Sequence, residues 1–343
     1  MQSRRTLLAT GAVALGLTGL RIAPARAAEP MPVVATFSIL GDMVARIGGA
    51  HVAVTTLVGP NGDTHVYQPT PADARAVSDA QLLIVNGLAF EGWLDRLVQA
   101  SGFSGHRVVA TDGIDAIAYG EGGAHDGEAH HDDHDGEDAH KDHDDHHDEH
   151  AHDEEHAHDD EHDHHHHGAF DPHGWQSLSN AVIYAGNIAA ALAEADPANA
   201  GAYEANRAAY VAELEALDAE IRGILGALPE DRRTIVTSHD AFQYFGRDYG
   251  LTFVSPQGPS TESEASAKDI ARLIERIREE NIAAVFVENI TDRRLLDQIA
   301  RETGATIGGT LYPGALSDPD GLAPTYLQMM RHNAITLAAA LSS

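Results

Sequence analysis

The sequence predicts an α/β protein of two halves, each built on a parallel sheet, with one long helix between them and a ligand site where the halves meet. Three observations lead to this class. Short apolar runs alternate with amphipathic stretches in both halves, which is typical of a parallel sheet with helices on its two faces. An extended helical pattern separates the halves. The length of 343 residues is that of about two domains.

Four buried strands are predicted in the first half, at residues 33–37, 52–57, 81–85 and 107–110. Helices are predicted between them at residues 38–47, from 72 onward and at 92–100. Ser38 directly follows the first strand and is expected to cap the first helix. Residues 59–71 are rich in Gly, Pro, Asn and Asp, and this composition predicts a loop after the second strand.

A helical pattern covers residues 176–228 and is interrupted at Asp196 and Pro197. Because proline suits the first turn of a helix, a new helix is predicted from 198 to about 225, roughly 40 Å long. Its large apolar residues recur at helical spacing, at Tyr203, Tyr210, Leu214, Leu217, Ile221 and Leu225. This length indicates a spine that joins the two halves.

The second half repeats the pattern of the first. Strands are predicted at 234–237, 251–254, 283–287 and 305–311, and helices at 267–280, 293–303 and 323–341. Ligands of open α/β sheets bind beyond the carboxyl ends of the strands. The loops that follow the strands are therefore where functional side chains are expected.

The negative charge of the chain is concentrated in one segment. Lys and Arg total 22 and Asp and Glu total 53, which gives a net charge of −31. Residues 125–167 alone hold 17 His and 19 acidic residues, and the rest of the chain has 21 basic and 34 acidic residues. A chain without clustered Lys and Arg is not expected to bind nucleic acid. The absence of Cys excludes disulfide scaffolds, Cys-ligated metal sites and a lipid-attachment cysteine.

Residues 1–27 have the pattern of an export signal. Arg4 and Arg5 form a basic start, residues 6–20 are apolar, and Ala25-Arg26-Ala27 fits a cleavage site. The apolar run is too short to span a membrane, which takes about 20 residues. The two arginines match a twin-arginine signal, and a Sec signal is the alternative. We expect an exported, soluble, periplasmic protein without a lipid anchor.

Three histidines outside the acidic segment share one kind of position. His65 follows the second strand, His173 precedes the first helix of the middle region, and His239 follows the first strand of the second half. All three can converge on the crevice between the halves, where three imidazoles suit Zn²⁺, with a carboxylate or a water as fourth ligand. Taken singly, each can also be an ordinary surface or helix-cap residue. No role is expected for the remaining three, His51, His106 and His332.

The segment at 124–168 has no apolar periodicity, so it is expected to be disordered without metal. Its repeated His and Asp place many imidazoles within chelating reach of one another, and this predicts several weak Zn²⁺ sites. A solvated spacer and a pH-sensitive loop are the alternatives. Scavenging, sensing and transfer of metal to the crevice all remain open as roles.

The sequence around the three histidines is similar to a known family. Residues 62–69, 171–175 and 239–245 resemble the zinc and manganese solute-binding proteins of ABC transporters, and residues 285–288 and 326–333 agree. The resemblance implies two (β/α) domains joined by a long rigid helix, with one metal in the interdomain cleft. The expected division is an N-terminal domain at 28–123, the His-rich segment at 124–168, the domain's end and the linking helix at 169–230, and a C-terminal domain at 231–343.

The same resemblance implies that His65, His173 and His239 are the metal ligands. Manganese-type members carry a carboxylate at the place of His239, so the histidine favours zinc, in agreement with ligand softness. Gly314 stands where many relatives carry an aspartate ligand. The fourth ligand is then a water or another carboxylate, and the candidates are Asp63, Asp318 and Glu262.

The predicted function is capture of Zn²⁺ and its delivery to the permease of an ABC importer, by a monomer that performs no chemistry of its own. A periplasmic zinc buffer or chaperone is one alternative, and a manganese-type solute-binding protein is another. Three protein ligands and a water are also the pattern of catalytic zinc, which keeps a hydrolase as a distant alternative. No positioned general base supports it.

Overall fold

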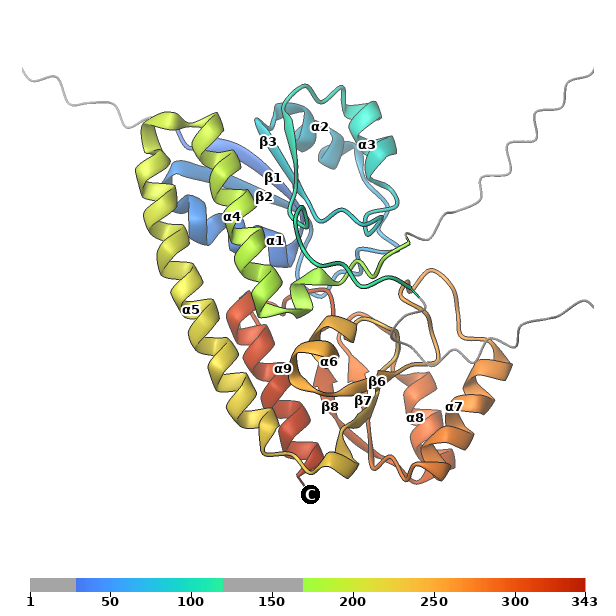
Figure 1. Cartoon of the computed structure of the whole chain (residues 1–343). Coiled ribbons are helices and arrows are strands. Elements are labelled where there is room, and N and C mark those ends of the chain that lie inside the picture. The colour runs from blue at the N-terminus through green and yellow to red at the C-terminus, as the bar shows by residue number, and fades with distance from the viewer. Residues whose placement is uncertain (1–28, 120–168, 343) are drawn as a thin grey trace, which may run out of the picture.

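The computed structural model describes residues 29–119 and 169–342. Within them, each half of the chain forms a four-stranded parallel sheet covered by helices (Figure 1). The predicted α/β class with two parallel sheets and a long helix is confirmed. The expected signal at 1–27 and the His-rich segment at 124–168 lie outside the described residues.

The first sheet has the strand order β2-β1-β3-β4, and all neighbours are parallel. Its strands are β1 (Met31–Phe37), β2 (Val52–Val58), β3 (Leu82–Val85) and β4 (His106–Val109). Helices α1 (Ser38–Gly48), α2 (Pro71–Asp79) and α3 (Leu94–Ser101) connect them. Each strand lies within two residues of its predicted bounds, because these strands are short apolar runs that the sheet buries, as the wholly buried β3 shows.

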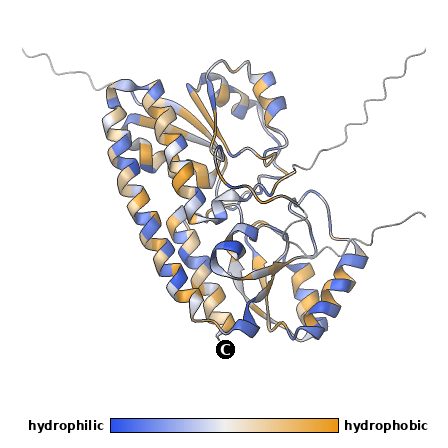
Figure 2. Ribbon diagram, in the orientation of Figure 1, coloured by the Kyte–Doolittle hydropathy of each residue, from blue (hydrophilic) through white to orange (hydrophobic). Residues whose placement is uncertain are grey.

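The second sheet has the order β6-β5-β7-β8, which is the same topology. Its strands are β5 (Thr234–Val236), β6 (Thr252–Val254), β7 (Ala284–Glu288) and β8 (Thr306–Leu311). Helices α7 (Ala267–Glu279) and α8 (Arg294–Thr303) pack hydrophobic sides against it and expose hydrophilic ones (Figure 2). Helix α6 (Gln243–Tyr249) was not predicted, because its seven residues are too few to display a helical period.

Helix α5 (Ala200–Gly226) runs along both halves and is the predicted spine (Figure 1). It packs against α1 and α4 (Leu178–Ala195) in the first half and against α9 (Tyr326–Leu341) in the second. It begins two residues later than predicted because 197–199 form a 3₁₀ turn. The predicted apolar positions, from Tyr203 to Leu225, are all buried. No helix among the described residues is long and apolar enough to cross a membrane.

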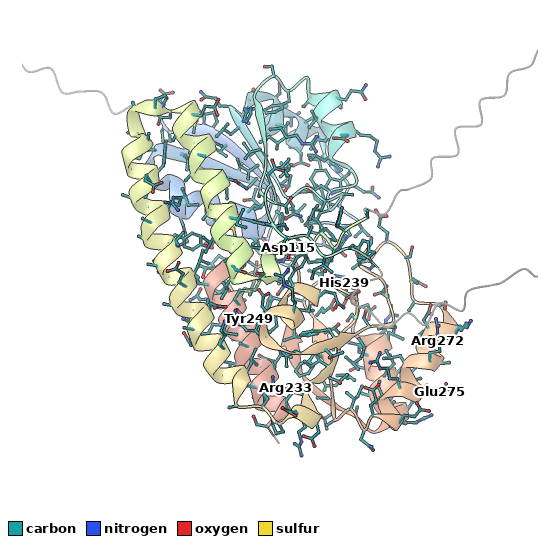
Figure 3. The ribbon with its side chains drawn as sticks, in the orientation of Figure 1. Asp115, Arg233, His239, Tyr249, Arg272 and Glu275 are labelled. Atoms are coloured by element: carbon teal, nitrogen blue, oxygen red, sulfur yellow. The ribbon has the colours of Figure 1, made fainter. Side chains whose placement is uncertain are left out.

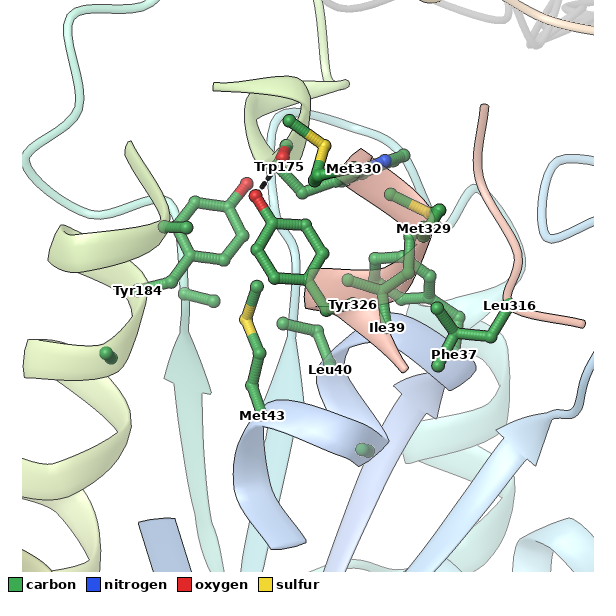
Figure 4. Close-up of a cluster of buried hydrophobic side chains, with 14 of the residues drawn as sticks. Phe37, Ile39, Leu40, Met43, Trp175, Tyr184, Leu316, Tyr326, Met329 and Met330 are labelled. Atoms are coloured by element: carbon green, nitrogen blue, oxygen red, sulfur yellow. Dashed lines mark hydrogen bonds between the residues drawn. The ribbon is translucent and has the colours of Figure 1, made fainter. Parts of the chain in front are cut away.

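One hydrophobic core extends from the first sheet through α5 into the second half, and a smaller core lies beneath α7 and α8. Tyr326, at the start of α9, is buried at the junction among Ile39, Leu40 and Met43 of α1 (Figure 4). Its hydroxyl donates to the backbone oxygen of Trp175. Because packed interiors resist deformation, this shared core holds the two halves in a defined relative position.

The expected cap at Ser38 is wrong. Phe37 occupies the N-cap position of α1 and makes no side-chain hydrogen bond, since Ser38 is already the first helical residue. The Ser38 hydroxyl instead accepts a hydrogen bond from the backbone N–H of Leu316, in the other half. A side chain expected to serve its own helix therefore connects the two halves.

Candidate metal centre

The structure brings His65, His173 and His239 together. One ring nitrogen of each lies within 4.8 Å of those of the other two. The Nε2 atoms of His65 and His173 are 3.3 Å apart. His173 and His239 are fully buried, and His65 is buried with a small exposed fraction. Among the described residues, no Asp or Glu joins this group.

The elements of both halves position the three rings. His65 lies in the loop between β2 and α2, and His173 lies in the turn before α4. His239 follows β5, which is one of the two inner strands of the second sheet. Figure 3 shows His239 between the halves. The loops at the carboxyl ends of parallel strands meet at one edge of a sheet, so the two sheets face each other across this cluster.

Two carboxylates orient two of the rings. The Nδ1 atom of His173 lies 2.7 Å from Oδ1 of Asp171, and that of His239 lies 2.6 Å from Oε2 of Glu288. A proton on Nδ1 that is donated to a carboxylate leaves the Nε2 lone pair free, and metal-binding histidines commonly have such partners. Glu288 is itself fixed, because its Oε1 accepts hydrogen bonds from the backbone N–H groups of Ser238 and His239.

His65 is held differently, through its backbone. Its N–H donates to Oδ1 of Asp63, whose Oδ2 accepts a hydrogen bond of 2.6 Å from the hydroxyl of Thr261 in the other half. The ring of Phe90 packs edge-on against His65 at a centroid distance of 4.8 Å. Asp63 thus links the halves beside the cluster and is not part of it.

The electrostatics favour uncharged imidazoles at two positions. Burial, together with the neighbouring histidines, holds the pKa of His65 and of His173 well below the ordinary value. Burial also lowers the pKa of His239, but the charge of Glu288 and the hydrogen bond to it outweigh this, so the net shift is upward. Burial raises the pKa of Asp171 to about 7.

A nitrogen of the histidine cluster is buried without a hydrogen-bond partner among the described residues, as expected for an atom that binds a metal. The Nε2 atom of His239 is buried and makes no hydrogen bond. Leaving such an atom unpaired costs about 1–3 kcal/mol. A cation placed among the three rings would take this lone pair. The donor set therefore fits a divalent metal that prefers nitrogen ligands.

Asp171 and Glu288 were not assigned a role from the sequence. Asp171 lies two residues before His173, so the sequence spacing alone could have predicted that the two side chains lie close together. Glu288 is 49 residues from His239 and reaches it because β5 and β7 are neighbours in the sheet. The signals for Glu288 were its position at the end of a predicted strand and the resemblance of residues 285–288 to the family.

The three candidates for a fourth ligand do not reach the cluster. Asp63 bonds to Thr261 and to the backbone of His65, and Asp318 accepts a hydrogen bond from the side chain of Asn61. Glu262 is exposed on the rim of a neighbouring pocket. At Gly314 a Cβ atom would make ordinary contacts, with Trp175 at 3.7 Å and Ile290 at 3.9 Å. The site therefore has space for a side chain at this position, although glycine has none.

Two parallel-sheet domains on a rigid helical spine, with a buried cluster of imidazoles between them, define a metal-binding protein of the solute-binding class. Comparison with known proteins identifies the family. The sequence profile of the family described as zinc-uptake complex component A, periplasmic, matches residues 33–340. The chain belongs to this family, whose members are substrate-binding proteins of ABC importers and not enzymes.

Similar proteins have names that refer to different metals. The chain is 31% identical to the iron-binding protein YfeA of Yersinia pestis over 92% of this chain and 88% of that protein. It is 30% identical to the manganese-binding lipoprotein MntA of Bacillus subtilis over 91% and 90%. The solved structure of the periplasmic zinc-binding protein TroA of Treponema pallidum matches with a TM-score of 0.73 at 27% identity, over 92% of this chain and 99% of that one.

Proposed function

We propose that His65, His173 and His239 bind Zn²⁺ in the interdomain cleft and that the protein delivers it to the permease of an ABC importer. The observation that carries this proposal is the all-nitrogen donor set, buried and oriented by Asp171 and Glu288. Imidazole suits Zn²⁺, whereas Mn²⁺ prefers oxygen ligands. A manganese-type site is the alternative within the family, and it would need a carboxylate that the described cluster lacks.

Diffraction from crystals of the zinc-loaded protein tests this proposal. Anomalous data at the zinc edge are expected to show one strong peak about 2.0–2.1 Å from a nitrogen of each of the three rings. A cleft without a peak in zinc-saturated crystals would contradict the proposal. Data at the manganese edge, from crystals soaked in both metals, are the matched control.

The proposed compartment is the periplasm, with export directed by residues 1–27 and the protein acting as a soluble monomer. Several relatives are named lipoproteins, but this chain has no Cys to carry the lipid. A periplasmic zinc buffer that supplies apo-proteins is the second candidate function. Adjacent permease and ATPase genes would favour the importer, and their absence would favour the buffer.

The described residues on the two sides of the His-rich segment pair with each other. Ala118 and Phe170 form an antiparallel bridge, and the N–H of Tyr119 donates to the oxygen of Ala169 at 3.0 Å. Phe170 is three residues from His173, and Tyr119 lines the pocket beside His65, so the described residues that flank the segment lie close to the cleft. We propose that the segment binds several Zn²⁺ ions weakly and supplies the cleft.

Deletion of residues 124–167 is expected to remove several zinc ions from the total stoichiometry and to leave one tight site. The flanking residues Tyr119 and Ala169 are already hydrogen-bonded to each other, so a short connection can join the two sides. Calorimetry of the intact and deleted proteins measures both quantities. A deleted protein without a tight site would show that the segment itself is the primary binding element.

Acidification from pH 7.5 to 5.5 is expected to release zinc from the segment before the cleft. Free imidazoles have a pKa near 6.5, so at pH 5.5 most of those in the segment are protonated and cannot bind metal. In the cleft, burial holds the pKa of His65 and of His173 well below the ordinary value, so these rings resist protonation as the pH falls. The raised pKa of His239 weakens the cleft as pH falls, but one site is expected to persist. Loss of the cleft ion first, in the same calorimetric series, would contradict this order.

The Asp171→Asn variant is expected to bind zinc about 10- to 100-fold more weakly, as is usual when an outer carboxylate partner of a ligand histidine is changed. An amide keeps the size of the side chain but holds the Nδ1 proton of His173 less strongly. Competition with a chromophoric chelator measures the affinity. Asp112→Asn, an exposed site with the same chemical change, is the control. An unchanged affinity in both variants would mean that Asp171 does not support the ligand.

A further inference from the structure

A pocket of about 530 Å³ lies beside His65, between the two halves. His65 lines it, together with Tyr67, Trp93 and Tyr119 as aromatic walls and Arg96 and Glu262 as charged groups. Hydrogen bonds hold two of the walls, from the Tyr67 hydroxyl to Asp73 and from the Trp93 indole to the oxygen of Thr64. Its volume is in the range of small-molecule pockets, about 300–1,000 Å³.

Of the three histidines in the cluster, His65 is the one that lines this pocket. His173 and His239 are fully buried, whereas His65 is 7% exposed and is part of the pocket wall. A zinc ion held by three imidazoles takes a fourth ligand. No carboxylate of the described residues joins the cluster, and His65 connects the cluster to the pocket. A donor from outside the protein is therefore expected to approach from the pocket.

The charged groups of the pocket complement a zwitterion. Arg96 comes from the first half, is exposed, and forms no ion pair within the described part of the chain. Glu262 comes from the second half and is also exposed. A guanidinium binds a carboxylate in a bidentate manner, and a carboxylate together with aromatic faces attracts an ammonium group.

We propose that the cleft takes zinc together with a small imidazole-bearing zwitterion, of the class of histidine or a short histidine-containing peptide. The imidazole of this ligand completes the zinc coordination from the pocket, its carboxylate pairs with Arg96, and its ammonium faces Glu262. This inference rests on the proposed zinc site. It makes the transported species a zinc complex in place of the bare ion.

Equilibrium dialysis with radiolabelled L-histidine tests the proposal on the full chain loaded with one equivalent of zinc. We expect the zinc-loaded protein to retain close to one equivalent of histidine, and the metal-free protein to retain about tenfold less. The His173→Ala protein, also with one equivalent of zinc, measures any histidine retained through the His-rich segment. Histamine, which lacks the carboxylate, and plain imidazole are expected to compete at least about tenfold more weakly, since a charge-assisted hydrogen bond contributes a factor of that order.

Arg96→Ala is expected to weaken histidine retention about tenfold or more, for the same reason. Arg75→Ala removes the same charge from an exposed position on α2 outside the pocket and is expected to retain histidine like the unchanged protein. Each titration is compared with the zinc affinity of the same variant measured without histidine. If Arg96→Ala simply loses its structure, its zinc affinity falls as well, whereas loss of the ligand contact lowers histidine retention alone.

Three results would contradict the inference, and each contradicts a different part of it. In the first, the unchanged protein holds one tight zinc that His173→Ala loses, but both proteins retain the same amount of histidine. A water or one of the chain's own donors then completes the site, and only the proposed zwitterion ligand is contradicted. If His173→Ala holds the first zinc equivalent as tightly as the unchanged protein, the proposed zinc site fails and the inference fails with it. Equal retention by Arg96→Ala and Arg75→Ala also contradicts the assigned carboxylate contact.

Discussion

The His173→Ala protein is expected to lose tight zinc binding, by more than the roughly 100-fold that loss of an outer partner causes. The ring of His173 is fully buried, and its Nε2 atom lies 3.3 Å from that of His65. Two remaining imidazoles cannot hold a zinc ion in a preorganised tetrahedron. The measurement is chelator competition on protein that lacks residues 124–167, so that the His-rich segment does not contribute.

Two controls accompany this variant. His106→Ala removes an exposed imidazole from β4 and is expected to leave the affinity unchanged. His239→Ala removes another member of the cluster and is expected to lose tight zinc binding in the same way. Circular dichroism verifies that the His173→Ala and His239→Ala proteins are folded. Unchanged binding of one zinc by folded His173→Ala would falsify the convergence of the three histidines on one ion.

The second large effect concerns the choice of metal. The cleft is expected to prefer Zn²⁺ over Mn²⁺ by at least about 100-fold, because its donors are imidazole nitrogens and its nearby carboxylates are bonded to the rings. Titration of the same deleted protein with each metal measures this ratio. Equal affinities would contradict the zinc assignment.

Gly314→Asp tests which feature sets this selectivity. A Cβ atom at position 314 has room, at ordinary contact distances from Trp175 and Ile290. An oxygen ligand is expected to raise the affinity for Mn²⁺ and to leave that for Zn²⁺ equal or tighter. Gly223→Asp, on the exposed side of α5 with open space around it, adds the same charge away from the cleft and is the control. A similar gain in both variants would show a general electrostatic effect.

The elements of the fold were predictable because their signals are local. Buried parallel strands are short apolar runs, and α5 shows its buried residues at helical spacing along its length. Helix α6 escaped prediction because it is shorter than two helical turns. The cap expected at Ser38 was wrong because the choice between a local and a distant hydrogen-bond partner depends on where Leu316 lies.

The residue types and their loops determined which side chains were candidates for the metal. His65, His173 and His239 were selected because each lies at the end of an element where α/β proteins bind ligands. Their approach to within 4.8 Å was decided by the tertiary structure, since it depends on how the two sheets face each other across α5 and the shared core. The same holds for Glu288, which meets His239 through a strand pairing that sequence distance conceals.

The sequence by itself determined which donors are available for the proposed site: three isolated imidazoles, a chain without Cys, and a glycine at 314, where the resemblance implies a carboxylate. Only the tertiary structure decided which carboxylates orient the rings, which ones remain out of reach, and where the cluster meets a pocket. The physical reason is that side-chain type is a property of each residue, whereas coordination requires atoms from distant segments to be placed within a few ångströms. That placement depends on the packing of the whole core.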